Sequence, residues 1–134
     1  MQFSRLLYNA VVLPLAAAGG AIGASLRYLT GMAALRLLGP GFPWGTLIVN
    51  VTGSFAMGLL IAALARLSAG NDVWRVFIAT GILGGFTTFS AFSLDVAALY
   101  ERGQLVLAAG YVLTSVVASI LALFAGLRVV RLLA

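Results

Sequence analysis

Four apolar stretches, each long enough to cross a lipid bilayer, occupy most of this 134-residue chain. A transmembrane helix needs about 20 largely apolar residues, and the stretches cover residues 8–38, 44–64, 73–100 and 105–127. Hydrophobic residues make up 63% of the chain and charged residues only 8%, too few to cover the surface of a water-soluble domain. The sequence therefore predicts an all-α integral membrane protein, a single four-helix transmembrane domain over residues 1–134.

The segments between the stretches agree with this division. Residues 39–43 contain two glycines and two prolines, which break a helix and start another. Residues 68–72 are predicted to end the second helix and cap the third. Trp44, Trp74 and Tyr100 fall at the edges of the stretches, where aromatic rings favour the headgroup layer.

Composition excludes several classes of function. The chain has neither cysteine nor histidine, so it lacks the side chains that zinc sites and hydrolytic enzymes use most, and no enzyme activity is expected. All eight basic residues are arginines that lie singly, whereas a nucleic-acid partner would require a clustered basic face. With both termini on one side of the membrane, five arginines flank that side and three the other. This bias is too weak to fix one orientation.

The N-terminus has a second interpretation. Arg5 before an apolar run, followed by the small residues 16–18, resembles a cleavable signal peptide. We favour a retained first helix, because its apolar pattern continues without a break to Arg27.

Small residues are frequent in the predicted helices and let helix backbones approach closely in a membrane. We expect the partner in this packing to be mainly a second copy of the chain. The glycines concerned are Gly19, Gly20, Gly23, Gly53, Gly58, Gly81 and Gly85.

Two polar features lie deep in the second and third helices. Asn50 is either a hydrogen-bond partner for another helix or an amide donor facing a pore. In the third helix, paired glycines at 84 and 85 followed by residues 86–93 form poor helix, so we predict a break at mid-membrane. The freed carbonyl groups must be satisfied internally, by threonine hydroxyls for example, or by an ion.

In the fourth helix, Tyr111, Ser115 and Ser119 are four residues apart and share one face. Their hydroxyls either line a route or bond to the backbone and to neighbouring helices. Together with an amide and aromatic edges, such hydroxyls suit a small anion. No carboxylate is predicted at mid-membrane, which argues against a cation pore.

Three motifs are similar to those of the small bacterial fluoride channels called Fluc or CrcB. They are residues 23–28, residues 45–50 with Gly53, and residues 84–93, and the likeness covers nearly the whole chain. The resemblance implies an antiparallel homodimer in the bacterial inner membrane, with two pores built from both copies. It implies fluoride as the transported ion and passive export of cytoplasmic fluoride as the role. Membrane lipid and a second copy are the other expected partners, and no nucleic acid.

The resemblance also implies the site residues. Arg27 corresponds to a vestibule arginine, although snorkelling of its side chain to the interface is an equal alternative. The implied cofactor is a structural sodium ion, held by the backbone carbonyls of Gly84 and Thr87 from each copy. The implied pore residues are Asn50, Phe89, Ser90, Phe92, Tyr111, Ser115 and Ser119.

Two positions depart from the family pattern. Ala91 stands where threonine is usual, and Asp95 stands where glutamate is common, so that the reach of its shorter side chain is open. Two rival functions remain at this stage, a proton-coupled exporter of the small multidrug-resistance kind and a purely structural protein. The exporter requires a carboxylate in the membrane, typically in the first helix, and this first helix contains none.

Overall fold

The computed structural model describes residues 2–66 and 72–133, with side chains from Ala10 to Arg66 and from Val73 onward. Within these residues four helical segments are long and apolar enough to cross a membrane, as predicted. They are Ala10–Leu38, Trp44–Leu64, Val73–Glu101 and Leu105–Leu132. The chain is a multi-pass membrane protein, and the cap predicted over residues 68–72 lies largely outside the described residues.

The first, second and fourth spans are single helices, whereas the third is divided. The first span belongs to α1, which is continuous through the alanines at 16–18. The third span passes from α-helix to π-helix and back to α-helix, and it is then interrupted between residues 86 and 89. The elements are α1 (Gln2–Leu38), α2 (Trp44–Leu64), α3 (Asp72–Arg75), the π-helix η1 (Val76–Leu83), α4 (Gly84–Phe86), α5 (Phe89–Glu101) and α6 (Leu105–Leu132).

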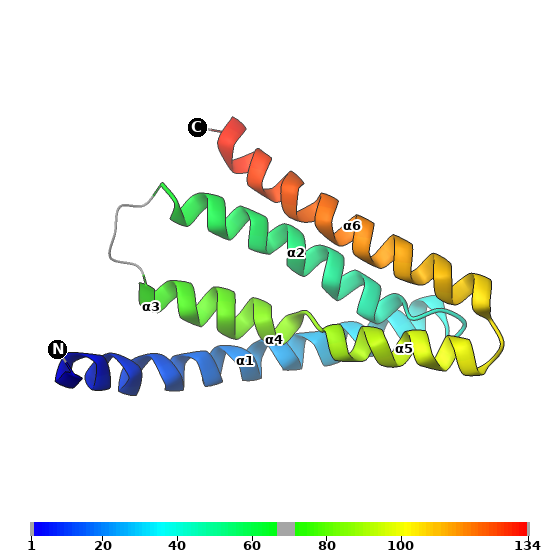
Figure 1. The fold of residues 1–134 in the computed structure, drawn as a ribbon, viewed down its shortest axis with the longest axis horizontal. Helices are drawn as coiled ribbons and strands as arrows, with labels where there is room; N and C mark the ends of the chain where they lie inside the picture. Colours follow the sequence, from blue (N-terminus) through cyan, green and yellow to red (C-terminus); the bar gives the residue numbers. More distant parts are fainter. Residues whose placement is uncertain (1, 67–71, 134) are drawn as a thin grey trace.

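Both termini lie at one end of the molecule, and the two connections that the structure describes lie at the other (Figure 1). Each connection reverses the chain within a few residues. Gly39 (φ 80°) and Gly103 (φ 72°) adopt left-handed backbone conformations there, which glycine reaches without a steric penalty. These two glycines therefore permit the tight hairpins between α1 and α2 and between α5 and α6.

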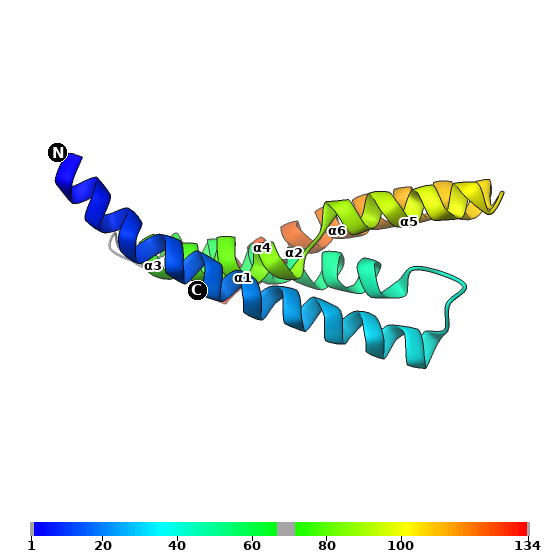
Figure 2. The same ribbon diagram turned by 90° about the horizontal axis from the view of Figure 1, so that it is seen from below.

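The third span packs against different helices before and after the interruption. Before it, η1 and α4 pack on α1; after it, α5 packs on α6. Figure 2 shows α5 bending away from α1 and running alongside α6. The residues around the interruption therefore lie where two helix packings meet, next to α2, which itself packs most extensively on α6.

Most of the glycines singled out above pack within the chain, so the prediction that a second copy is their main partner is wrong. A Cβ on Gly19 or Gly81 would meet the backbone of the facing helix in the α1 contact with η1. A Cβ on Gly23 or Gly85 would do the same where α1 meets α4. The sequence pattern shows that close approach occurs, but it does not identify the neighbouring helix. On α2, Gly53 faces Phe86 and Thr87 of the third span, and Gly58 faces α6.

We predict that Gly23→Ala destabilises the fold while Gly20→Ala does not. A Cβ at position 23 would overlap the carbonyl oxygen of Ile82 and lie 2.8 Å from the Phe86 nitrogen. A Cβ at position 20 meets nothing within 4 Å. Overpacking typically lowers the free energy of unfolding by about 1–3 kcal/mol, measurable by circular dichroism during denaturation in detergent. Equal stability of the two variants would contradict the close α1 packing.

Candidate functional site

The interruption of the third span is stabilised by the side chain of Asn50 on α2. The Asn50 Nδ2 donates to the Thr88 carbonyl oxygen at 2.9 Å, and the Asn50 Oδ1 accepts from the Thr88 backbone nitrogen at 2.7 Å. One amide side chain thus satisfies both polar backbone groups of the residue where the helix is open. The structure thus contains the hydrogen bond between helices, one of the two roles predicted for Asn50, and the pore role stays a prediction.

Thr88 in turn begins the next helix. Its backbone is extended (φ −154°, ψ 125°), and its Oγ1 accepts from the Ala91 backbone nitrogen at 3.1 Å. This is N-capping, in which a side-chain oxygen satisfies a backbone N–H of the first helical turn. A threonine directly before a new helix is a sequence signal for such a cap.

The hydrogen bonds of Asn50 to the Thr88 N–H and of Thr88 Oγ1 to the Ala91 N–H leave two backbone carbonyl oxygens without their helical donors. In an uninterrupted α-helix, the Thr88 N–H would donate to the Gly84 carbonyl and the Ala91 N–H to the Thr87 carbonyl. Here both N–H groups donate to side chains instead. The freed carbonyls of Gly84 and Thr87 are those predicted to bind a cation. Within the described part of the chain no cluster of three His, Cys, Asp or Glu side chains could hold a metal.

A pocket of about 490 Å³ opens at the interruption. Its walls come from α2, the third span and α6, and its lining contains no charged side chain. Seven of the ten predicted site residues line it, namely Asn50, Gly84, Thr87, Phe89, Phe92, Ser115 and Ser119. The structure therefore brings together residues that are up to 69 positions apart in the sequence, Asn50 and Ser119.

The hydroxyl of Ser119 differs from several others in the described part of the chain. Its Oγ is buried and has no hydrogen-bond partner among the described residues. By contrast, five hydroxyls donate to the carbonyl one turn earlier in their own helix, those of Ser25, Thr30, Thr52, Thr87 and Ser93. A buried polar group without a partner is costly and points to a bound water, ion or ligand.

Aromatic rings connect the pocket to the hairpin end of the molecule. Phe89 and Phe92 lie with ring centroids 5.5 Å apart, and Phe92 lies 5.3 Å from Tyr111. Phe92 and Tyr111 are buried, whereas 77% of the Phe89 surface is exposed. The edge of Tyr111 then meets Phe42 in a T-shaped contact at 5.4 Å. The two predicted pore phenylalanines are therefore neighbours, and one of them faces outward from the single chain.

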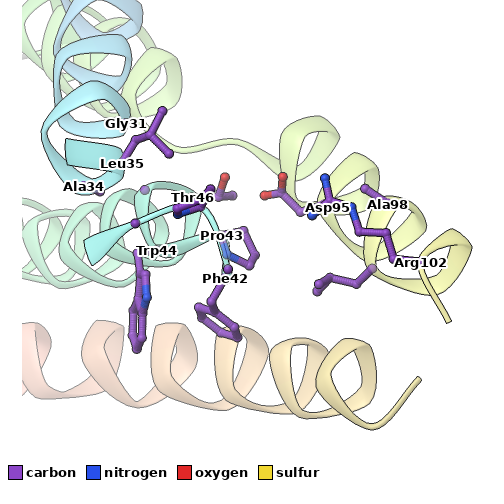
Figure 3. A pocket seen from close by; sticks show the side chains of 15 residues that line it. Gly31, Ala34, Leu35, Phe42, Pro43, Trp44, Thr46, Asp95, Ala98 and Arg102 are labelled. Carbon is purple, nitrogen blue, oxygen red and sulfur yellow. The ribbon is translucent and has the colours of Figure 1, made fainter. Parts of the chain in front are cut away.

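A second pocket, of about 290 Å³, lies at the hairpin end between α1, the 39–43 connection and α5. Asp95 of α5 and Arg102, the residue after α5, line it, and Figure 3 shows Thr46 and Asp95 pointing toward one another. The Tyr111 hydroxyl donates to Asp95 Oδ2 at 3.1 Å. Sequence reasoning left the role of Asp95 open, since no local pattern pairs residues 16 positions apart on different helices.

Three predicted site residues do not line the pocket at the interruption. Tyr111 is fully buried beside Asp95. Ser90 is exposed, and its Oγ lies 3.2 Å from the Thr88 hydroxyl. Arg27 is half-buried on α1, outside the lining of either pocket.

The sequence model described as "CrcB-like protein, Camphor Resistance (CrcB)" matches residues 14–127, a stretch that contains every residue lining the larger pocket. The chain belongs to the CrcB family. Several relatives carry the name fluoride-specific ion channel FluC. The FluC of Mesorhizobium japonicum is 62% identical over 113 residues, covering 84% of this chain and 90% of that protein. The FluC of Chelativorans sp. is 65% identical over 114 residues, covering 84% and 90%. The FluC of Agrobacterium fabrum is 56% identical over 117 residues, covering 87% and 94%.

Membership of the CrcB family confirms the resemblance found in the sequence motifs. The relatives are named as channels, in agreement with the expectation that this chain is not an enzyme. Their likeness extends through all four spans, so it concerns the whole membrane domain and not one motif.

We predict that Asn50→Leu destabilises this CrcB protein by opening the interruption. Leucine has a similar volume but leaves both backbone groups of Thr88 unpaired, which costs about 1–3 kcal/mol for each buried group. Thr52→Val is the matched control, because the Thr52 hydroxyl only donates to the Ile48 carbonyl in the same helix. Hydrogen exchange at the Thr88 amide should accelerate in Asn50→Leu alone. Unchanged exchange would contradict the role assigned to Asn50.

Proposed function

We propose that this CrcB protein is a fluoride-selective ion channel through which fluoride leaves the bacterial cytoplasm passively, so that its toxicity is lowered. Relatives that are 56–65% identical carry the name fluoride-specific ion channel. The likeness covers the interruption, Asn50 and the polar line of α6 together. The proposed route runs past Asn50, Phe89, Phe92, Ser115 and Ser119.

The observation that carries the proposal is the unpartnered hydroxyl of Ser119. It lies in a pocket with Ser115, of which only 4% is exposed, and with no charged side chain. A hydroxyl proton that no protein acceptor takes is available to an anion. Because hydrogen bonds to an ionised acceptor are about twice as strong as neutral ones, fluoride is a suitable partner for such a group.

The surroundings of Ser119 favour weak binding of an anion at several points. The ring edges of Phe89 and Phe92 carry partial positive charge, which suits an anion passing beside them. Conduction requires an ion to be bound well enough to enter and weakly enough to leave. Single hydroxyls and ring edges on rigid helices satisfy both requirements, whereas a buried arginine in the pocket would hold the anion too tightly. Asn50 keeps one Nδ2 proton beyond the one that it donates to Thr88.

The exporter alternative has no corresponding support. Its coupling carboxylate would have to lie on the substrate route, and the lining of the pocket at the interruption contains neither Asp nor Glu. Asp95, the acidic residue nearest to it in the sequence, accepts a hydrogen bond from Tyr111.

A second copy of the chain would complete the route. Gly84, Thr87 and Phe89 line the pocket, and Gly84 and Phe89 are exposed in the single chain. Lipid cannot donate hydrogen bonds to the freed carbonyls of Gly84 and Thr87, so leaving them uncovered in the bilayer is costly. A two-fold related copy would cover the face of each chain with that of the other and produce two pockets. The antiparallel arrangement of the copies stays a prediction.

A sodium ion would fit the same face. The carbonyl oxygens of Gly84 and Thr87 are freed from their helical donors, and interrupted membrane helices bind sodium through such oxygens. Two copies would offer four of them. When bound, the ion would neutralise the partial negative charge of these oxygens and hold the two interruptions together.

Anion efflux from liposomes containing the purified protein tests the function. We expect fluoride to leave rapidly when the membrane voltage is clamped with potassium and valinomycin, while chloride is retained. Protein-free liposomes control for leakage. Retention of fluoride by liposomes containing correctly folded protein would overturn the proposed function, and equal loss of both ions would overturn the selectivity.

The same assay tests the route through Ser119→Ala, with Ser25→Ala as the matched control. The Ser25 hydroxyl is exposed and donates to the Ala21 carbonyl, so its loss should leave efflux unchanged. Loss of the Ser119 donor should slow fluoride efflux about ten- to a hundredfold, as expected when a hydrogen bond to a charged partner worth about 1.5–3 kcal/mol is removed. Equal rates in the two variants would remove Ser119 from the route.

The sodium and dimer proposals are tested by replacing sodium chloride with N-methylglucamine chloride at equal ionic strength. We expect the dimer fraction in detergent, measured by size-exclusion chromatography with light scattering, to fall when sodium is absent. A dimer fraction independent of sodium would contradict the ion site. A monomer in sodium would contradict the dimer itself.

A further inference from the structure

The hydrogen bond between Tyr111 and Asp95 has a direction that affects the polar line of α6. A hydroxyl has one proton, and the Tyr111 proton points to Asp95 Oδ2 at 3.1 Å. Toward any other neighbour, Tyr111 therefore presents only the lone pairs of its oxygen. An anion at this position would meet an acceptor and not a donor.

The hydroxyl residues Tyr111, Ser115 and Ser119, which form the polar line of α6, are consequently not equivalent. Ser119 has a buried and unpartnered hydroxyl, and Ser115 lines the same uncharged pocket. Tyr111 lies one turn further toward the hairpin end and is fully buried, outside that pocket. Ser119 can therefore donate its proton to an anion, whereas the proton of Tyr111, nearer the hairpin end, is already donated to Asp95.

Asp95 occupies the position between Tyr111 and the pocket at the hairpin end. It lines that pocket together with Thr46 and Arg102 (Figure 3). Of the residues lining the pocket, Asp95 and Arg102 are the charged ones, and α1 and the 39–43 connection contribute none. One hydrogen bond, from Tyr111 to Asp95, thus connects the polar line of α6 to the lining of the hairpin pocket.

We propose that Asp95 is a positioning residue that holds the Tyr111 hydroxyl proton away from the permeating anion and thereby limits the rate of fluoride passage at the hairpin end. This inference rests on the proposed fluoride channel and names a residue that regulates its rate. Fluoride passes this point when the Tyr111 hydroxyl turns from Asp95 and donates to the ion. The side chain of Asp95 does not bind the ion itself.

The test compares fluoride efflux from liposomes containing wild type, Asp95→Asn, Tyr111→Phe and the double variant. A neutral amide oxygen is a weaker acceptor than a carboxylate, so Asp95→Asn frees the Tyr111 proton. Its efflux should be about three- to tenfold faster than wild type, the size expected when a hydrogen bond to an ionised group becomes one to a neutral group. Glu101→Gln is the matched control, since it removes an exposed carboxylate from the same helix end and should leave efflux unchanged.

The Tyr111→Phe background separates an effect through Tyr111 from an effect of charge alone. We expect Asp95→Asn to produce no acceleration when residue 111 is phenylalanine. Acceleration of the same size in that background, or slower efflux in folded Asp95→Asn, would overturn the proposal. Asp95→Glu should restore a rate near that of wild type, because it restores the charged acceptor. If wild type shows no fluoride efflux, both the fluoride channel and this inference are overturned. If wild type is active and Asp95→Asn has the same efflux rate, the inference alone is overturned.

Discussion

The paired hydrogen bonds between Asn50 and the backbone of Thr88 are the interaction on which the rest of the structure depends. Within a bilayer no water is present to satisfy an open backbone, so an interrupted helix needs a partner from the protein. An asparagine amide contains one acceptor and a donor group in a geometry that matches a peptide unit. Asn50 therefore lets the third span open at Thr88 and at the same time connects it to α2.

Opening the third span at this point allows its two halves to follow different neighbours. The first half packs on α1 through contacts between glycines, as between Gly19 and Gly81. The second half packs on α6, where Phe92 lies against Tyr111. The pocket at the interruption lies where these two packings meet, and its walls come from α2, the third span and α6.

Hydroxyl groups in this membrane domain divide according to what they donate to. Five donate to the backbone one turn earlier, as Ser25 and Thr52 do. Ser119 donates to no described residue, and Tyr111 donates to Asp95. Sequence spacing placed Tyr111 and Ser119 on one face of a helix, yet it could not distinguish their hydrogen bonds, because these depend on which side chains other helices bring near them.

The sequence by itself determined the four spans, the hairpins and the place of the interruption, because these follow from local hydropathy, glycine conformation and weak helix propensity near residues 84–93. It also contained the motifs that identify the CrcB family. Only the tertiary structure decided that the glycines pack within the chain, that Asn50 satisfies Thr88, and that Asp95 accepts from Tyr111. These contacts join residues distant in the chain, and their partners are selected by helix packing, which no local pattern encodes.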